Sequence, residues 1–197
     1  MSKRSFIACS VLVLFAVFAI PGCWQLSVHP LYTDEDLVSV DGLEGVWGDP
    51  DDPEDETWQF IESDGKSYRL IIREEQQSLL VNPAKDGLFE VHLLRLGGRL
   101  YMDIFPEEPE GVNGFYMGHV IPAHSFVMVK LEGHVLTLSS LDVEWLKKGI
   151  EEGSMDIKHE RRDNTIVLTA STGELQEFVV RYAEEAFTAE DPVYRLQ

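Results

Sequence analysis

Four short turn sequences, each lying between two strand-like runs, constrain the fold of this chain more than any other feature. They are Asp64-Gly65, Gly97-Gly98, Glu132-Gly133 and Asp163-Asn164. Pairs of this kind supply the positive φ angles that tight β-hairpins require, so each pair predicts a hairpin. The hairpins should span residues 57–73, 88–105, 125–140 and 156–170, and further strands are expected near 43–48 and at 115–121.

The apolar residues around each turn predict which side chains share a face, because a slip of one residue exchanges the two faces of a strand. A two-residue loop at Gly97-Gly98 places Leu93 opposite Met102 on an apolar face. The other face, which we expect to meet solvent, carries His92, Tyr101 and Asp103. At the first turn, a three-residue loop over 63–65 with Gly65 left-handed is needed to bring the apolar residues of both strands to one face.

Two helices are expected beside these strands. One runs from Asp142 to Glu152, and the other follows Ser171, whose spacing to Glu174 is that of a capping box. One-sided strands in such number must stack or close, since closure removes exposed edges. We therefore predict a mainly β fold, an antiparallel meander of about nine or ten strands that closes into a barrel, with the final helix covering an opening or one flank.

The triplet Gly45-Val46-Trp47 lies just before the first hairpin. It resembles the Gly-x-Trp motif in the first strand of lipocalins. The order of an N-terminal arm, a series of hairpins and a late helix is similar as well. The resemblance implies a single lipocalin-like barrel domain over residues 43–197, with Trp47 plugging the closed end of the barrel.

The N-terminus has the pattern of a secretory signal peptide. Lys3 and Arg4 precede an apolar run from Phe6 to Ile20, and the break Pro21-Gly22-Cys23 follows. As a helix the run would rise only about 22 Å, against about 30 Å of bilayer hydrocarbon, so a permanent membrane span is the weaker alternative.

The ending Ile20-Pro21-Gly22-Cys23 resembles the lipobox of bacterial lipoproteins. The resemblance implies that the Cys23 thiol receives a diacylglyceryl group, that residues 1–22 are removed, and that Cys23 is then N-acylated. Residues 23–42 would form a lipidated tether to the membrane. Trp24, standing where lipoproteins of the inner membrane usually carry Asp, favours the outer membrane facing the periplasm. Cys9, the other cysteine, lies in the segment to be removed, so no internal disulfide is expected.

The charge of the chain excludes one class of partner. Acidic residues outnumber basic ones 35 to 16, a net charge of −19. Removal of residues 1–22 takes two basic residues and leaves 14 basic against 35 acidic ones, a charge of −21. Such an excess repels phosphate backbones, so we expect no nucleic-acid binding.

Recognised catalytic sequences are missing from the chain: it has no Gly-x-Ser-x-Gly elbow, no His-Glu-x-x-His and no phosphate-cradling glycine loop. We therefore expect a non-enzymatic protein without a cofactor or a bound metal. The sharpest candidate site is a cationic pair, His159 and Arg161, on the face that also carries Ile166 and Leu168. A cationic pair on an apolar wall suits a ligand with a carboxylate head and a hydrocarbon tail. In the alternative, Arg161 extends to solvent and His159 bonds a backbone carbonyl.

Four further segments allow both a functional and a structural interpretation. The acidic run 49–56 offers oxygen ligands to calcium or forms a solvated loop. His92 and Asp103 form an acid–base pair or an ordinary cross-strand contact. His119 and His124 would need a further ligand to bind zinc. The connection 106–124 is a lid or binding loop, or, if 115–121 is a buried strand, part of the core.

Two functions of different class follow from these expectations. The first is a lipid-anchored envelope protein that holds a small apolar or amphiphilic ligand inside the barrel. The second is a protein-interaction module of the envelope whose barrel is solid. A void beside His159 and Arg161 would favour the first, and an interior filled by Trp, Phe and Leu would favour the second.

Overall fold

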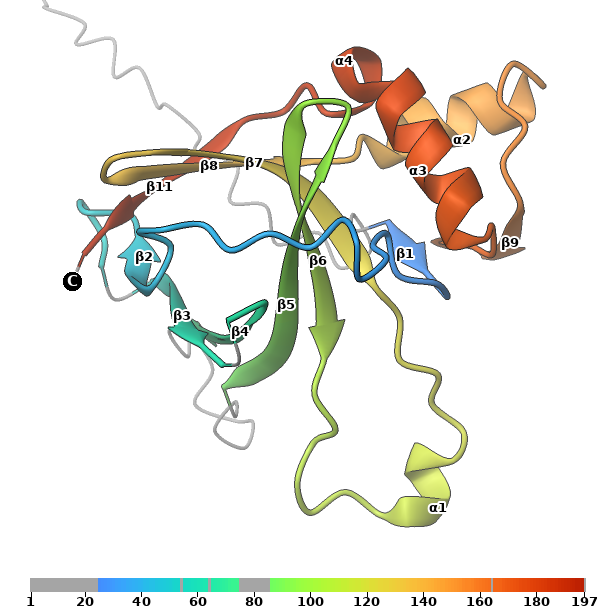
Figure 1. Ribbon diagram of the computed structural model, residues 1–197. Coiled ribbons are helices and arrows are strands. Elements are labelled where there is room, and N and C mark those ends of the chain that lie inside the picture. Colours follow the sequence, from blue (N-terminus) through green and yellow to red (C-terminus); the bar gives the residue numbers. More distant parts are fainter. Residues whose placement is uncertain (1–24, 54, 64, 75–85, 164, 197) are drawn as a thin grey trace, which may run out of the picture.

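The computed structural model describes residues 25–53, 55–63, 65–74, 86–163 and 165–196. Its main feature is a closed antiparallel barrel of eight strands (Figure 1). Around the barrel these are β11 (Asp191–Arg195), β2 (Gly45–Gly48), β3 (Glu56–Glu62), β4 (Ser67–Glu74), β5 (Gly87–Leu96), β6 (Arg99–Pro106), β7 (Ser125–Glu132) and β8 (Val135–Ser140). The predicted mainly β fold with a closed barrel is confirmed.

A second layer lies beside the barrel. A three-stranded sheet has the order β1 (Leu26–Ser27), β10 (Thr165–Leu168) and β9 (His159–Arg162). The helices α2 (Val143–Glu151), α3 (Thr172–Arg181) and α4 (Ala183–Ala186) gather at the same side of the molecule (Figure 1). A further short helix, α1 (Gly114–Met117), lies in the connection between β6 and β7. Within the described chain, no helix combines the length and the apolar character needed to cross a bilayer.

The predicted registers are largely confirmed. Gly97 and Gly98 both have positive φ, and Leu93 pairs with Met102 as expected. The last hairpin pairs Arg162 with Thr165, which is the predicted register. At the first turn Gly65 is left-handed and the faces are as predicted, although Glu62 pairs with Tyr68, two residues further along than the predicted loop requires. In the third hairpin Glu132 pairs with Val135, so the loop begins one residue later than predicted.

Two predictions about the barrel wall are wrong. The hairpin 156–170 lies outside the barrel, and β11, at the very end of the chain, closes it instead. A barrel strand must present an apolar inner face, and β9 (His-Glu-Arg-Arg) has none, whereas β11 contributes Val193 to the inner cluster. The predicted strand at 115–121 is also wrong. Asn113 there accepts hydrogen bonds from the backbone N–H groups of Phe115 and Tyr116 and so caps the short helix α1.

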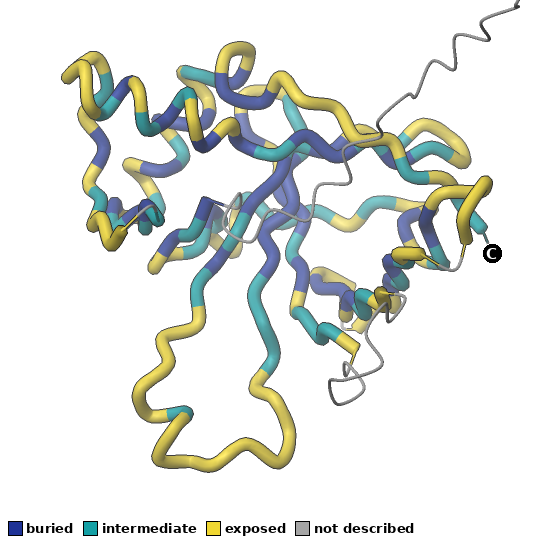
Figure 2. Tube along the Cα trace, turned by 180° about the vertical axis from the view of Figure 1, so that it is seen from behind, coloured by how far each residue is buried: buried dark blue, intermediate teal, exposed yellow. Residues whose placement is uncertain are grey.

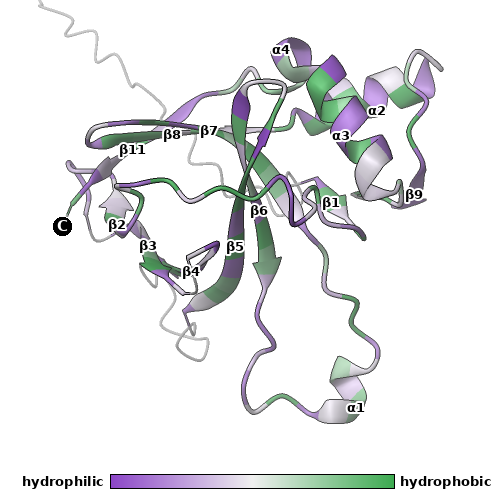
Figure 3. Ribbon diagram, viewed as in Figure 1, coloured by the Kyte–Doolittle hydropathy of each residue, from purple (hydrophilic) through white to green (hydrophobic). Residues whose placement is uncertain are grey.

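Consecutive buried residues occur within β5, β6 and β7 (Figure 2), so these strands are covered on both faces over part of their length. Hydrophobic and hydrophilic residues alternate along β5 (Figure 3), and the inner face packs with Trp47, Trp58 and Phe60. The outer face was expected to meet solvent, yet Tyr101 is 0% exposed. It packs in an outer cluster formed with α2, α3 and the three-stranded sheet, which contains Leu31, Leu94, Tyr101, Phe126, Leu146, Ile166, Leu175 and Phe178.

The segment expected to act as a tether is packed on the domain over its described part. Gln25 and Ser27 are buried, and β1 pairs in parallel with β10. Leu31 is fully buried in the outer cluster. The described part of this segment, from residue 25 on, therefore belongs to the folded body, because burial of these side chains orders the backbone that carries them.

The predicted capping box at the start of α3 is confirmed. The Glu174 carboxylate accepts hydrogen bonds from the Ser171 backbone N–H (2.8 Å), the Ser171 hydroxyl (2.8 Å) and the Lys158 ammonium (2.8 Å). The hydrogen bond from Lys158, followed by those from Ser171, lowers the pKa of Glu174 to about 2. The contacts favour the charged carboxylate and join α3 to the segment before β9.

We expect Glu174→Gln to destabilise the protein at pH 7 and to have little effect near pH 2. The folded-state pKa lies below the ordinary value of 4.5, so the stabilisation is present above pH 4.5 and is lost as the pH falls toward 2. Urea unfolding of both proteins across this range measures the difference in free energy. Glu177→Gln, an exposed position on the same helix, is the matched control. If Glu174→Gln lowered the free energy of unfolding by the same amount at every pH, this account of the cap would be contradicted.

Candidate functional site

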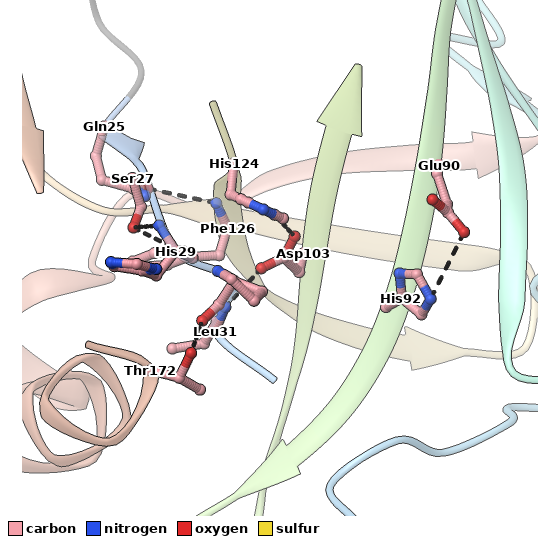
Figure 4. A network of polar contacts seen from close by, with 11 residues as sticks. Gln25, Ser27, His29, Leu31, Glu90, His92, Asp103, His124, Phe126 and Thr172 are labelled. Atoms are coloured by element: carbon pink, nitrogen blue, oxygen red, sulfur yellow. Dashed lines mark hydrogen bonds and ion pairs between the residues drawn. The ribbon is translucent and has the colours of Figure 1, made fainter. Parts of the chain in front are cut away.

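A buried polar junction joins three parts of the chain on the outer face of β6 (Figure 4). Its centre is Asp103, 1% exposed, whose Oδ2 accepts a hydrogen bond of 2.7 Å from the Leu31 backbone N–H. A second hydrogen bond of 2.7 Å joins Oδ1 of Asp103 to Nδ1 of His124, which is 9% exposed. The carboxylate thus holds the N-terminal segment and the start of β7 at the same time.

Neighbouring contacts fix the same three segments. Ser27 and His124 exchange two backbone hydrogen bonds of 2.8 Å, and the Phe105 ring lies 4.4 Å from the His124 ring, centroid to centroid. The Thr172 hydroxyl donates to the Pro30 carbonyl (2.8 Å), which attaches α3 (Figure 4). Alternation along β6 explains the position of Asp103, since residues 101 and 103 both point away from the barrel interior.

Asp103 and His124 could form an acid–base pair by their chemistry, but their contacts hold segments of this chain together. Both carboxylate oxygens of Asp103 are occupied by groups of this chain, and the pair is buried. In the described part of the chain, no three or more His, Cys, Asp or Glu side chains are grouped so as to hold a metal ion. Two surface pockets, one at α2 and one at α3, have neither Asp103 nor His124 among their lining residues. A buried carboxylate whose bonds are all made within the chain stabilises the fold.

The predicted pairing of His92 with Asp103 is confirmed for the backbone and wrong for the side chains. The two residues are register partners across β5 and β6. The His92 side chain, however, stacks on the Tyr32 ring (4.3 Å) and lies 3.8 Å from the Glu90 carboxylate. Burial, and then the charges of Asp103, Glu90 and Asp34, raise the pKa of Tyr32 to about 12. His92 therefore contributes to packing of the N-terminal segment.

His159 and Arg161 share a face with Leu168 and Ile166, as the register predicted. The sheet that carries them is outside the barrel, so they do not line its interior. His159 Nδ1 donates to the Ile157 carbonyl (2.8 Å), and Arg161 pairs with the exposed Glu151 (2.7 Å). Arg161 lines a shallow surface pocket whose other residues are charged, namely Glu144, Lys147, Lys148 and Glu151. A charged, open pocket does not suit a hydrocarbon tail.

The other candidate groups are dispersed. His119 Nδ1 donates to the Phe115 carbonyl (2.7 Å) in α1, whereas His124 binds Asp103. In the acidic run, Asp49 accepts a hydrogen bond from the Asp51 backbone N–H, and Glu56 accepts one from the Trp58 indole N–H. Glu54, in the same run, lies outside the described residues. Cys23, the predicted site of lipid attachment, lies outside them as well.

The barrel interior is occupied by large side chains. Trp47 is fully buried and its indole N–H donates to the Leu43 carbonyl (2.8 Å). The Arg195 guanidinium stacks 4.5 Å from the centre of the Trp47 ring and donates to the Glu44 carbonyl (2.5 Å) and to the Gly42 carbonyl. This contact ties the end of the chain to the segment before β2, and so completes the closure of the barrel by β11.

The connection between β6 and β7 projects from the body (Figure 1), and we call its residues 107–123 the finger. Its large apolar side chains lie on the surface, among them Phe115 at 81%, Tyr116 at 62% and Ile121 at 81% exposure. Of the two alternatives for this connection, the one that places Phe115 and Tyr116 in the core is therefore wrong. Alternation could not reveal this, because buried strands and exposed apolar loops both appear as apolar runs.

Comparison of the chain with models of protein families, with curated proteins and with solved structures finds no match.

Proposed function

We propose that this chain is a non-enzymatic lipoprotein of the bacterial cell envelope, held in the membrane through Cys23, whose solid barrel serves as a scaffold for protein interactions. The lipid anchor is supported by the sequence Ile20-Pro21-Gly22-Cys23 after the basic and apolar N-terminal segment. Trp24 supports the outer membrane, with the body in the periplasm. Two or more acyl chains hold a protein firmly, at about 0.8 kcal/mol for each buried methylene.

The large side chains inside the barrel favour a scaffold for protein interactions over a carrier of a small ligand. An eight-stranded barrel is just wide enough for its own side chains, or for one small ligand if those side chains are small. Here the inner cluster includes the large residues Trp47, Trp58, Phe60, Tyr68, Leu70 and Met102, all buried. A ligand cavity of about 300–1,000 Å³ would require several of them to leave. His159 and Arg161, the residues proposed for a carboxylate head, lie on another sheet.

Mass spectrometry of the protein extracted from membranes in detergent tests this choice. We expect the native mass, once detergent is removed, to equal the mass of the same preparation after denaturation. Covalent acyl chains contribute to both masses, so only a non-covalent ligand would separate them. A native mass that exceeds the denatured mass by a lipid-sized ligand would contradict a solid barrel. Loss of that ligand in Arg161→Ala would then assign it to the site that the sequence predicted.

A further inference from the structure

The finger exposes several large apolar side chains between residues 112 and 121. None of the residues of α1 is buried, and the exposed large apolar side chains of the finger are Val112, Phe115, Tyr116, Val120 and Ile121. Figure 2 shows an almost continuous exposed trace along this connection. Several large apolar side chains exposed on one connection are typical of a surface that meets a partner or a membrane. Because the finger projects from the body, its tip can enter such a partner without obstruction from the barrel (Figure 1).

The composition of the finger points to a lipid surface. Residues 111–124 contain no Asp, Glu, Lys or Arg, in a chain where charged residues make up 26%. Phe115 and Tyr116 lie together at α1, and aromatic residues of this kind favour the interface between headgroups and acyl chains. The capped N-terminus of α1 satisfies two backbone N–H groups within the chain, which lowers the cost of leaving water.

The lipid anchor begins beside the finger. Cys23 precedes the buried Gln25 by two residues in the sequence. Ser27, two residues further on, pairs through its backbone with His124, the residue at which the finger meets β7. A bilayer that holds the acyl chains of Cys23 is therefore close to the base of the finger.

The charges next to the finger indicate which lipids it suits. Its first residues include Glu107, Glu108 and Glu110, and Glu107 pairs with Arg69 (2.7 Å). Together with the charge of −21 expected after removal of residues 1–22, these carboxylates oppose an anionic surface. A zwitterionic surface carries no such opposing charge.

Building on the proposed lipid anchor, we propose that the finger is a second membrane contact, which inserts Phe115, Tyr116 and Ile121 into the zwitterionic surface of the bilayer that holds Cys23. The acyl chains supply most of the attachment. The finger sets how the barrel is oriented on the membrane.

A single introduced thiol tests the finger, because the mature chain has no free cysteine once Cys23 is acylated and Cys9 is removed. The lipidated Val120→Cys variant is labelled with an environment-sensitive fluorophore and incorporated into phosphatidylcholine–phosphatidylethanolamine vesicles. We expect a blue shift and loss of iodide quenching when vesicles are present. His134→Cys, exposed in the turn between β7 and β8, is the matched position and should remain quenched.

Substitutions then distinguish membrane contact by the finger from attachment through the acyl chains. Phe115→Ser combined with Ile121→Ser should restore quenching of the probe at residue 120 while the protein still floats with the vesicles. Ile61→Ser, an exposed apolar position on β3, should leave the blue shift unchanged. A probe at residue 120 that stays water-exposed on vesicle-bound protein would overturn the membrane contact, as would shielding that occurs only when a second envelope protein is added. Failure of the wild-type protein to bind vesicles at all would instead contradict the lipid anchor.

Discussion

Asp103→Ala is expected to lower the free energy of unfolding by about 2–6 kcal/mol, because two buried groups each lose their acceptor at a cost of about 1–3 kcal/mol. The substitution leaves the Leu31 N–H and the His124 ring nitrogen without their acceptor inside the protein. It also loosens the contact between the N-terminal segment and β6, on which the outer cluster is built. Urea unfolding followed by circular dichroism measures the loss.

Two further variants make the Asp103 experiment specific. Asp103→Asn keeps the size of the side chain and one oxygen that can accept from Leu31, so we expect a smaller loss than for alanine. Glu90→Ala changes an exposed carboxylate on the neighbouring strand and should have little effect. A loss for Asp103→Ala no larger than that for Glu90→Ala would show that the junction does not hold these segments together.

The hairpins could be predicted from the sequence because their geometry is local. Gly97 and Gly98 both adopt positive φ, which a two-residue turn of this hairpin type demands. Once such a turn is placed, alternation along the two strands determines which side chains lie together, and Leu93 pairs with Met102 accordingly. An error in the position of a loop leaves these faces unchanged when the pairing of the two strands shifts by two residues. The hairpin in which Glu132 pairs with Val135 is an example.

The neighbours of each hairpin could not be predicted in this way. Pairing within β9 and β10 does not specify which sheet they join, so the register of His159 and Arg161 was right and their place in a barrel wall was wrong. β11 is short and contains Pro192, so it lacks a clear alternating pattern, and it pairs with β8 only after the intervening helices. Such long-range contacts depend on packing of the whole chain.

The contacts of the candidate site could not be predicted from the alternation of residues either. Asp103 lies on a face that alternation predicts to be wet, and its partners Leu31 and His124 are distant in sequence. One signal was present: Leu93 and Leu94 are adjacent, and both are buried because β5 is covered on both faces. Consecutive apolar residues in an alternating strand thus indicate a second layer, and Tyr101 belongs to the same surface.

Lipid attachment at Cys23 should determine where the protein is found in the cell. The wild-type chain is expected in the membrane fraction and should be released by detergent but not by high salt, since acyl chains rather than charge hold it. Cys23→Ala removes the thiol that we propose to accept the diacylglyceryl group and should abolish the lipid modification completely. Cys9→Ala lies in the segment to be removed and should behave as the wild type.

Intact mass spectrometry of the membrane-derived protein tests this account most directly. We predict a polypeptide that begins at Cys23, carries the mass of a diacylglyceryl group and one further acyl chain, and loses both in Cys23→Ala. A membrane-derived protein that retains residues 1–22, or one whose Cys23 is unmodified, would contradict it.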